Sequence, residues 1–312
     1  MRQRYIVIGS GSIGRRHHEN IKILGADSTL LPWRGLDMGI LEQNLRDAAG
    51  AVIATATDVR IELVKLCASL GTAVYVEKPL AFTSAGLESL LKAAKPVAGR
   101  SVAGFMMRYN PAFKALVQDP VDAFRFSMEV GHDVRRWRQG WSFSGSYAAR
   151  PHGGGVLLDL CHEIDMVTCL YPGLALGEVA CIGHTHFPGV DFATRVSLYR
   201  AGLVGDVAMD YLSPKSVRRL SVRGRNGGLD LDLVSGREIR WQGARETERH
   251  WASERNIMFL DLMRDFMALA EGRDTHRNPL LPRLDLVGES SALVARAWEA
   301  RRFHGETDWG HA

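Results

Sequence analysis

Cysteine is scarce in this 312-residue sequence. The four cysteines, Cys67, Cys161, Cys169 and Cys181, form no C-x-x-C motif, so neither a zinc knuckle nor a redox-active dithiol is indicated. Long apolar runs are missing too, since none approaches the roughly 18–20 residues that a membrane-spanning helix needs. The short apolar run near the N-terminus ends at Gly9, too early for a signal peptide. We expect a cytoplasmic protein with reduced, buried thiols and no membrane partner.

A large excess of either positive or negative charge is also missing. The chain has 39 lysines and arginines against 35 aspartates and glutamates, a formal net charge of +4. The arginines are scattered, and aromatic residues do not alternate with them as they do in nucleic-acid-binding motifs. We therefore expect no nucleic-acid partner, and the small positive excess favours anionic small molecules only weakly.

Apolar runs and helical patterns alternate through the first hundred residues. The runs cover residues 5–8, 29–31, 51–54, 73–76 and 101–105. Strands buried on both faces that alternate with helices are typical of a parallel, doubly wound sheet. We predict a Rossmann α/β domain over residues 1–116.

The pattern changes after about residue 118, where strand-like runs follow one another directly. Turn signals such as Asn226-Gly227-Gly228 separate them. The runs cover residues 123–130, 178–186, 193–200, 204–211, 219–222, 229–234 and 238–241. One helix is expected over residues 155–170, and two more over 253–271 and 283–302. This pattern predicts an α+β domain with a large, mainly antiparallel open sheet over residues 117–312.

The open sheet also bears on assembly. Too few helices follow the strands to cover both faces of a large sheet, and an exposed sheet face of this kind tends to mark an interface. We therefore predict a homodimer or homotetramer built on this sheet, with two-fold symmetry.

A glycine-rich turn follows the first apolar run. Gly9-Ser10-Gly11-Ser12-Ile13-Gly14 has G-x-G-x-x-G spacing between an expected strand and an expected helix, which is the context that dinucleotide binding requires. Gly9 allows the tight turn, Gly11 lets the backbone approach a pyrophosphate, and Gly14 lets the helix pack against the strand. The free N–H groups of the helix start favour an anion. These six residues are predicted to bind a nucleotide cofactor.

The end of the second apolar run bears on the choice of cofactor. It reads Leu31-Pro32-Trp33-Arg34, with no carboxylate before Asp37, whereas NAD binding would place an acidic residue there for the ribose 2′-hydroxyl. Arg34 can pair with a 2′-phosphate, and Trp33 can stack on adenine. The alternative is that both are surface residues. NADP is favoured over NAD.

Glu77-Lys78-Pro79 follows the fourth apolar run. Ligands of open α/β sheets bind beyond the carboxyl ends of the strands, so Lys78 would point toward the nicotinamide. An ammonium group there can donate to a substrate hydroxyl and stabilise the developing negative oxygen. The position of Lys78 at the end of a strand fits an ordinary solvent-exposed lysine equally well.

The helix expected over residues 155–170 carries a second group of polar residues. Asp159 and His162 are three positions apart, so they would share a face of that helix. Histidine is well suited to accept a proton near neutral pH, and a neighbouring carboxylate would orient its ring. The alternative is a buried structural pair. With Asp165 these residues form no complete ligand set, so no metal is expected.

These motifs, in this order, resemble those of the Gfo/Idh/MocA family of oxidoreductases. The resemblance covers nearly the whole chain and extends to residues 104–111, the triple glycine at 153–155 and the closing helix over 261–271. It implies reversible hydride transfer between a nicotinamide cofactor and a carbohydrate or cyclitol carbinol. Lys78 matches the family's catalytic lysine, Asp159 the aspartate after the glycines, and His162 the family histidine.

Three departures from the family pattern stand out. One residue is missing between Asp159 and His162, although a turn of about 100° per residue keeps both groups near one helix face. The nicotinamide loop reads Thr55-Ala56-Thr57 where the family usually has Thr-Pro. The first domain is short after its second strand, so part of the adenosine pocket is expected to be open. Thr55, Glu77 and Lys78 join the glycine turn as expected cofactor-binding residues.

The residues around the second motif resemble a branch of the family met in surface-polysaccharide or sugar-nucleotide pathways. Arg108, Trp137, Arg138 and Tyr147 would suit a sugar with an anionic or nucleotide group, beside Lys78, Asp159 and His162; each also fits a surface or core position.

The function expected is NAD(P)-dependent oxidation or reduction at a hydroxyl or keto carbon of a sugar, sugar derivative or sugar nucleotide. An NAD-dependent glycosidase with transient oxidation and a non-catalytic NAD(P)-binding regulator are the alternatives. The sugar, the carbon and the direction stay open.

Overall fold

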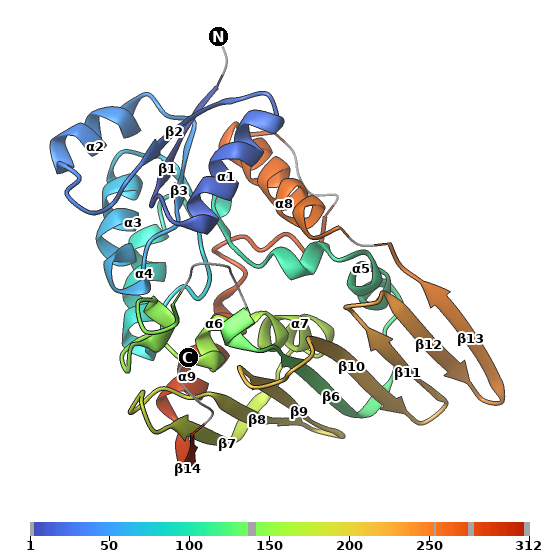
Figure 1. Ribbon diagram of the computed structural model, residues 1–312. Helices are drawn as coiled ribbons and strands as arrows, with labels where there is room; N and C mark the ends of the chain where they lie inside the picture. The colour runs from blue at the N-terminus through green and yellow to red at the C-terminus, as the bar shows by residue number, and fades with distance from the viewer. Residues whose placement is uncertain (1–2, 137–141, 253, 274–277, 309–312) are drawn as a thin grey trace. The chain divides into compact units, whose positions relative to one another are not determined.

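The computed structural model describes residues 3–136, 142–252, 254–273 and 278–308 (Figure 1). The chain packs as two compact units. One comprises Met1–Asn110 with Glu254–Ala292, and the other comprises Pro111–Ser253 with Leu293–Ala312. The sequence placed all of residues 117–312 in a second domain, whereas residues 254–292 pack with the first unit.

The first unit is built on a five-stranded parallel sheet in the order β2-β1-β3-β4-β5. The strands are β1 (Arg4–Ile8), β2 (Asp27–Leu31), β3 (Gly50–Ile53), β4 (Ala73–Val76) and β5 (Val102–Ala103). The order reverses between β1 and β3, and such a switch point opens a ligand-binding crevice beyond the carboxyl ends of the strands. The predicted doubly wound parallel sheet is confirmed.

Helices cover this sheet on both faces. They are α1 (Ser12–Ile23), α2 (Met38–Arg46), α3 (Arg60–Ser69), α4 (Ser84–Ala94) and α8 (Arg255–Ala270). Helices α1 and α8 pack together, as do α3 and α4, and Figure 1 shows the two pairs on opposite faces. Double coverage explains why β3 and β4 are buried at every residue and read as unbroken apolar runs.

Helix α8 joins the core of the first unit through Phe266. The Phe266 ring makes edge contacts with Tyr5 and Tyr75, at centroid distances of 6.1 and 5.8 Å. A Cβ atom at Gly50 would lie 2.9 Å from Cζ of Phe266. The sequence pattern predicts this helix correctly, but its periodicity carries no information about which sheet it covers.

The second unit is built on a nine-stranded sheet in the order β13-β12-β11-β10-β6-β9-β8-β7-β14. Its strands are β6 (Ala123–Gly131), β7 (Ala175–His184), β8 (Ala193–Arg200), β9 (Leu203–Asp210), β10 (Val217–Gly224), β11 (Gly227–Asp232), β12 (Arg237–Gln242), β13 (Arg245–His250) and β14 (Arg302–Thr307). Neighbouring strands are antiparallel except β6 with β9 and β7 with β14. The predicted mainly antiparallel sheet is confirmed.

Four short elements were not expected. The edge strands β13 and β14 are largely charged or exposed, so they lack the apolar alternation that marks a strand. Helices α2 and α5 (Pro111–Gln118) are short. Helix α9 covers Gly288–Glu299, so it begins later and ends earlier than the expected helix over residues 283–302.

The two faces of the nine-stranded sheet differ in character. On β6, Phe126, Met128 and Val130 are buried, and α7 (His162–Leu170) packs against this strand. The alternate residues Ser127 and Glu129 are exposed. The exposed face carries cross-strand contacts such as Arg219–Asp232 at 3.4 Å and Arg195–Asp206 at 3.5 Å, beside the exposed side chains of Tyr199 and Val204.

The helix expected over residues 155–170 is divided in two. Helix α6 covers Val156–Asp159 and α7 begins at His162. Leu160 leaves the helical region at φ −104° and ψ 32°, which interrupts the ladder of backbone hydrogen bonds. Neither glycine nor proline marks the break in the sequence. Asp159 and His162 therefore do not share a face of one helix, and that part of the prediction is wrong.

Candidate active site

The glycine turn has the geometry that its sequence predicts. Gly9 has a φ of 111°, and a Cβ atom there would lie 2.5 Å from the carbonyl oxygen of Ala54. A Cβ atom at Gly14 would lie 1.8 Å from the carbonyl oxygen of Gly9, whereas one at Gly11 would meet nothing within 4 Å. Gly9 and Gly14 are thus required by packing, and the backbone at Gly11 is open on the side from which a ligand would approach. This open backbone at the start of α1 fits a dinucleotide pyrophosphate.

Three loops meet at the carboxyl edge of the parallel sheet. Ile8, Ile53 and Val76 are the last residues of β1, β3 and β4 and are aligned in register. The glycine turn, the Thr55 loop and the Glu77-Lys78-Pro79 turn follow directly. The structure thereby brings together most of the residues predicted to bind cofactor: Gly9, Ser10, Gly11, Ser12, Ile13, Gly14, Thr55, Glu77 and Lys78.

Glu77 is buried and makes hydrogen bonds through both carboxylate oxygens. His17 donates from Nε2 to Oε1 at 2.7 Å, and the backbone N–H of Lys78 donates to Oε2 at 3.1 Å. Burial raises the pKa of Glu77, but the hydrogen bond from His17 and the charges of His17, Lys78 and Arg60 outweigh it and lower the pKa overall. Glu77 is therefore ionised at neutral pH, and its contacts with His17 and with the Lys78 backbone hold the turn that carries Lys78.

The end of β2 carries no carboxylate that could bind a ribose. Trp33 is half-buried and Arg34 is exposed. Asp37 caps α2, because its Oδ1 accepts a hydrogen bond from the Ile40 N–H at 2.9 Å. Capping the helix is a sufficient role for this carboxylate, so its presence does not indicate a bound ribose.

In the second unit, Asp159 receives hydrogen bonds on both carboxylate oxygens. The Tyr147 hydroxyl lies 2.5 Å from Oδ1, and the Tyr211 hydroxyl lies 3.2 Å from Oδ2. Asp159 and Tyr211 are buried, whereas Tyr147 is 43% exposed. Burial, followed by the charge of Asp159, raises the pKa of Tyr211 well above its usual value, so Tyr211 stays a hydroxyl donor. Sequence reasoning selected Asp159 and Tyr147 but missed Tyr211.

The start of α6 is fixed by a buried carboxylate. Asp191 accepts the backbone N–H of Leu157 at 2.9 Å and the guanidinium of Arg301 at 2.6 Å. A Cβ atom at Gly155 would lie 2.0 Å from Oδ1 of Asp191, which accounts for glycine at this position. The fixed helix start in turn sets the position of Asp159 at its end.

His162 begins α7 and is 7% exposed. The next residue, Glu163, is fully buried and pairs with Nε of Arg218 on β10 at 2.8 Å. Arg218 and Arg219 lie on opposite faces of β10, as successive strand residues do. His162, Glu163 and Arg218 therefore belong to the helix-covered side of the sheet.

His132, which follows β6, is a further titratable group that sequence reasoning missed. Its ring lies 5.9 Å from the Tyr211 ring, centroid to centroid. Burial, aided by the charge of Arg218, lowers the pKa of His132, although Asp159, Asp210 and Asp133 oppose the shift. His132 is therefore a neutral imidazole at neutral pH.

Other predicted substrate residues lie elsewhere. Arg108 is buried in the first unit, and its Nη1 lies 3.4 Å from the Leu280 carbonyl oxygen. Trp137 and Arg138 lie outside the described residues. Lys78 belongs to the first unit, and Asp159 and His162 belong to the second.

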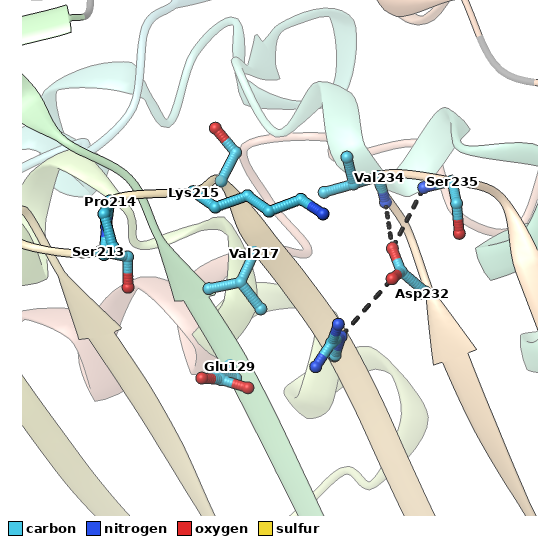
Figure 2. Close-up of a pocket in the computed structure, with 10 residues that line it drawn as sticks. Glu129, Ser213, Pro214, Lys215, Val217, Asp232, Val234 and Ser235 are labelled. Atoms are coloured by element: carbon cyan, nitrogen blue, oxygen red, sulfur yellow. Dashed lines mark hydrogen bonds and ion pairs between the residues drawn. The ribbon is translucent and has the colours of Figure 1, made fainter.

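A shallow hollow lies on the exposed face of the nine-stranded sheet. It has a volume of about 360 Å³, and Glu129, Arg219 and Asp232 contribute to its lining. Figure 2 shows Lys215 extending across it toward Val234. Asp159 and His162 do not line this hollow, so it is distinct from the candidate active site.

The described residues contain neither a metal-binding cluster nor a membrane-spanning helix. Among the described residues, no group of three histidine, cysteine, aspartate or glutamate side chains is placed to hold a metal ion. Within the same part of the chain, every helix is too short or too polar to cross a bilayer. Three of the four cysteines are buried, and Cys169 is half-buried.

Solved structures with a similar fold include several dehydrogenases and a ketoreductase. UDP-N-acetylglucosamine 3-dehydrogenase from Acidithiobacillus ferrooxidans is 17% identical, with a TM-score of 0.77 over 96% of this chain and 98% of that chain. Levoglucosan dehydrogenase in complex with NADH is 17% identical, with a TM-score of 0.73 over 96% and 97%. A 3-ketoreductase from Actinomadura kijaniata, solved with NADP, is 14% identical, with a TM-score of 0.76 over 98% and 99%.

Sequence comparison adds one curated relative and no family model. Trans-1,2-dihydrobenzene-1,2-diol dehydrogenase from Xenopus laevis is 23% identical over 205 residues, which is 61% of this chain. The match spans 60% of that relative's length. No protein-family model matches the sequence. The structural neighbours have the fold of Gfo/Idh/MocA-type oxidoreductases, so the predicted resemblance is confirmed at the level of the fold.

Proposed function

We propose that this protein is an NAD(P)-dependent oxidoreductase acting on a hydroxyl or keto carbon of a sugar, sugar derivative or sugar nucleotide. One observation carries the proposal. The open backbone at Gly11 and the Glu77-Lys78-Pro79 turn lie at the same edge of a parallel sheet. The fold is shared with structures solved with NADH and with NADP, and such an edge is where dinucleotides bind.

The cofactor-binding residues follow from this edge. The backbone of residues 9–14 would hold the pyrophosphate, and Thr55 would lie beside the nicotinamide. A bound nicotinamide supplies a site that gives or takes a hydride. In the direction of oxidation, the substrate carbinol loses a hydride from carbon and a proton from oxygen, so this chain must accept the proton.

In this proposal His162 accepts that proton, and the Lys78 ammonium stabilises the substrate oxygen as its negative charge develops. Asp159 orients the substrate and His162, and its own carboxylate is fixed by Tyr147 and Tyr211. In the reverse direction the same groups return the proton to the keto oxygen. His162 is suited to this exchange because an imidazole nitrogen can accept a proton and give it back.

NADP is the proposed cofactor of preference. The carboxylate nearest the end of β2, that of Asp37, caps α2, and the nearby Arg34 is exposed. A guanidinium pairs well with a 2′-phosphate, whereas NAD-binding sites usually place a carboxylate at this position.

We also propose a cytoplasmic homodimer or homotetramer with two-fold symmetry, built on the exposed face of the nine-stranded sheet. Opposite charges alternate across its strands, as in Arg219–Asp232 and Arg195–Asp206. A two-fold axis brings the same patch of each subunit together, so arginines of one copy can pair with aspartates of the other. The proposed contact is therefore ionic, on the sheet from which the sequence predicted assembly.

A panel of sugars and sugar nucleotides tests the function directly. Purified protein is incubated with each compound and NADP or NAD, and absorbance of the reduced nicotinamide is followed. Net, substrate-dependent reduction is the expected result. Tightly retained cofactor with glycoside cleavage but no net reduction would indicate a glycosidase, and cofactor binding without any turnover would indicate a regulator.

A further inference from the structure

Arg60 is a buried cation at the first position of α3. A positive charge is unfavourable at a helix N-terminus, where the helix dipole is itself positive, and burying a charge costs free energy unless it is paired or hydrogen-bonded. Helix α3 therefore does not account for an arginine at this position. The compensating interactions come from outside the helix.

The guanidinium of Arg60 binds three backbone carbonyl groups. Nη1 donates to the carbonyl oxygen of Glu77 at 2.5 Å and also to that of Pro79. Nη2 and Nε donate to the carbonyl oxygen of Thr55, at 2.8 and 3.2 Å. Because the guanidinium is planar and rigid, it fixes these carbonyl groups relative to one another.

The three carbonyl groups belong to two loops of the candidate site. Thr55 follows β3, and Glu77 and Pro79 follow β4 and flank Lys78. The Lys78 backbone is held at a third point, because its N–H donates to Oε2 of Glu77 at 3.1 Å. Arg60 thus joins the loop expected beside the nicotinamide to the turn that carries the expected catalytic lysine.

We infer that Arg60 is a positioning residue that holds Lys78 and the Thr55 loop in register for hydride transfer. The inference rests on the proposed function. Arg60 acts through the backbone of these loops. A displacement of about 1 Å at a reacting group can cost on the order of 100-fold in rate, so the clamp is expected to affect kcat much more than cofactor affinity.

Arg60→Lys is the informative variant because it keeps the charge but loses the planar, multi-donor geometry. We expect kcat to fall roughly 10- to 100-fold, with the Kd for cofactor changed less than about threefold, since the glycine turn is untouched. In Arg60→Ala, added guanidinium ion should restore part of the lost kcat. Arg4→Lys is the matched control: Arg4 also donates to a backbone carbonyl, that of Asn44 at 2.8 Å, but at the opposite end of β1.

Hydrogen exchange gives a readout that needs no substrate. Peptides covering residues 54–57 and 76–81 should exchange on the order of tenfold faster in Arg60→Lys, because charged hydrogen bonds are lost, while other peptides of the unit stay unchanged. Faster exchange confined to these loops would support the clamp even if the wild-type protein turned over no sugar. Unchanged exchange would overturn it. An Arg60→Lys enzyme with the kcat of the wild type would also overturn it. The same holds if Arg60→Ala loses stability, cofactor binding and kcat in parallel and added guanidinium restores none of them.

Discussion

The Tyr211 hydroxyl lies 3.2 Å from Oδ2 of Asp159, across 52 positions of sequence. Tyr211 is fully buried, and its raised pKa keeps the proton on the oxygen. Together with Tyr147, it gives Asp159 a hydroxyl donor on each carboxylate oxygen. The carboxylate is thereby held in one orientation before any substrate arrives.

Tyr211→Phe should lower turnover while leaving the fold intact. The change removes a hydroxyl that donates to Oδ2 of Asp159 and to the carbonyl oxygen of Gly155, both at 3.2 Å. A hydrogen bond to a charged group is worth about 1.5–3 kcal/mol, which corresponds to roughly 10- to 100-fold in kcat/KM if the bond orients Asp159 in the transition state. Steady-state kinetics with the identified substrate would measure it. Tyr199→Phe, at an exposed tyrosine of β8, is the control, and equal activity of both variants would contradict the role of Tyr211.

Lys78→Ala and His162→Ala should each lose about 10²- to 10⁴-fold in turnover, the usual contribution of a positioned acid or base. Both should still bind cofactor, because neither change touches the glycine turn. The double variant should lose much less than the product of the single losses if the two residues act as a unit. A His162→Ala enzyme with near-normal activity on its true substrate would refute the proposed proton exchange.

Arg34→Ala should weaken NADP binding and leave NAD binding nearly unchanged. Loss of a charge-assisted contact to a 2′-phosphate is worth about 1.5–3 kcal/mol, or roughly 10- to 100-fold in Kd. Fluorescence titration with both reduced cofactors would measure this. Arg46→Ala, at an exposed arginine that pairs with Glu42 in α2, serves as the control. Tighter binding of NAD than of NADP by the wild-type protein would argue against the preference.

Glu77 should make stability depend on pH in the acid range. Its pKa is lowered in the folded protein, so the unfolded chain binds more protons there, and stability falls as the pH falls. The contribution of Glu77 is fully present above the ordinary glutamate pKa of about 4.3 and is lost as the pH drops through the lower folded value. Urea unfolding of wild-type and Glu77→Gln protein between pH 6 and about pH 3 should show a flatter profile for the variant. Glu42→Gln, whose side chain on α2 is 41% exposed, should follow the wild type. Parallel Glu77→Gln and wild-type profiles would contradict the expectation.

The proposed assembly should respond to salt. An ionic interface weakens as the Debye length shortens, from about 10 Å at 0.1 M to about 3 Å at 1 M salt. Light scattering at micromolar concentration should therefore show a dimer or tetramer that dissociates as salt is added. Arg195→Glu should dissociate at lower salt than Lys65→Glu, a charge reversal at an exposed lysine of α3. A monomer at every salt concentration would exclude this assembly.

The sequence predicted those elements whose pattern is set by burial. Strands β4 and β8 begin and end at the expected residues, because one is buried throughout and the other alternates between a covered and an exposed face. Strands β13 and β14 escaped notice because they lie at the edges of the sheet and carry charged side chains. The break at Leu160 has no glycine or proline to mark it.

The residues of the candidate site likewise fall into those that a local sequence motif marks and those that no local motif marks. Local motifs identified the glycine turn, Lys78 and Asp159, since each lies in a strand-turn-helix or turn-helix context that carries its own signature. Tyr211 and His132 were missed because the contact of Tyr211 with Asp159, and that of His132 with Tyr211, join segments that are distant in sequence. Arg60 was missed because its contacts with two loops show only in the folded chain. An arginine at the start of α3, where a cation is unfavourable, was the one available sign of the clamp.

The return of α8 to the first unit has a consequence for synthesis of the chain. Tyr5 and Tyr75 emerge from the ribosome early, but their partner Phe266 emerges only after the whole of the second unit's main segment. Until then the sheet face that α8 covers is exposed apolar surface, the kind of surface on which nascent chains aggregate and chaperones act. A fragment ending at Asn110 would keep that face uncovered permanently, so the first unit cannot be isolated by cutting the chain once.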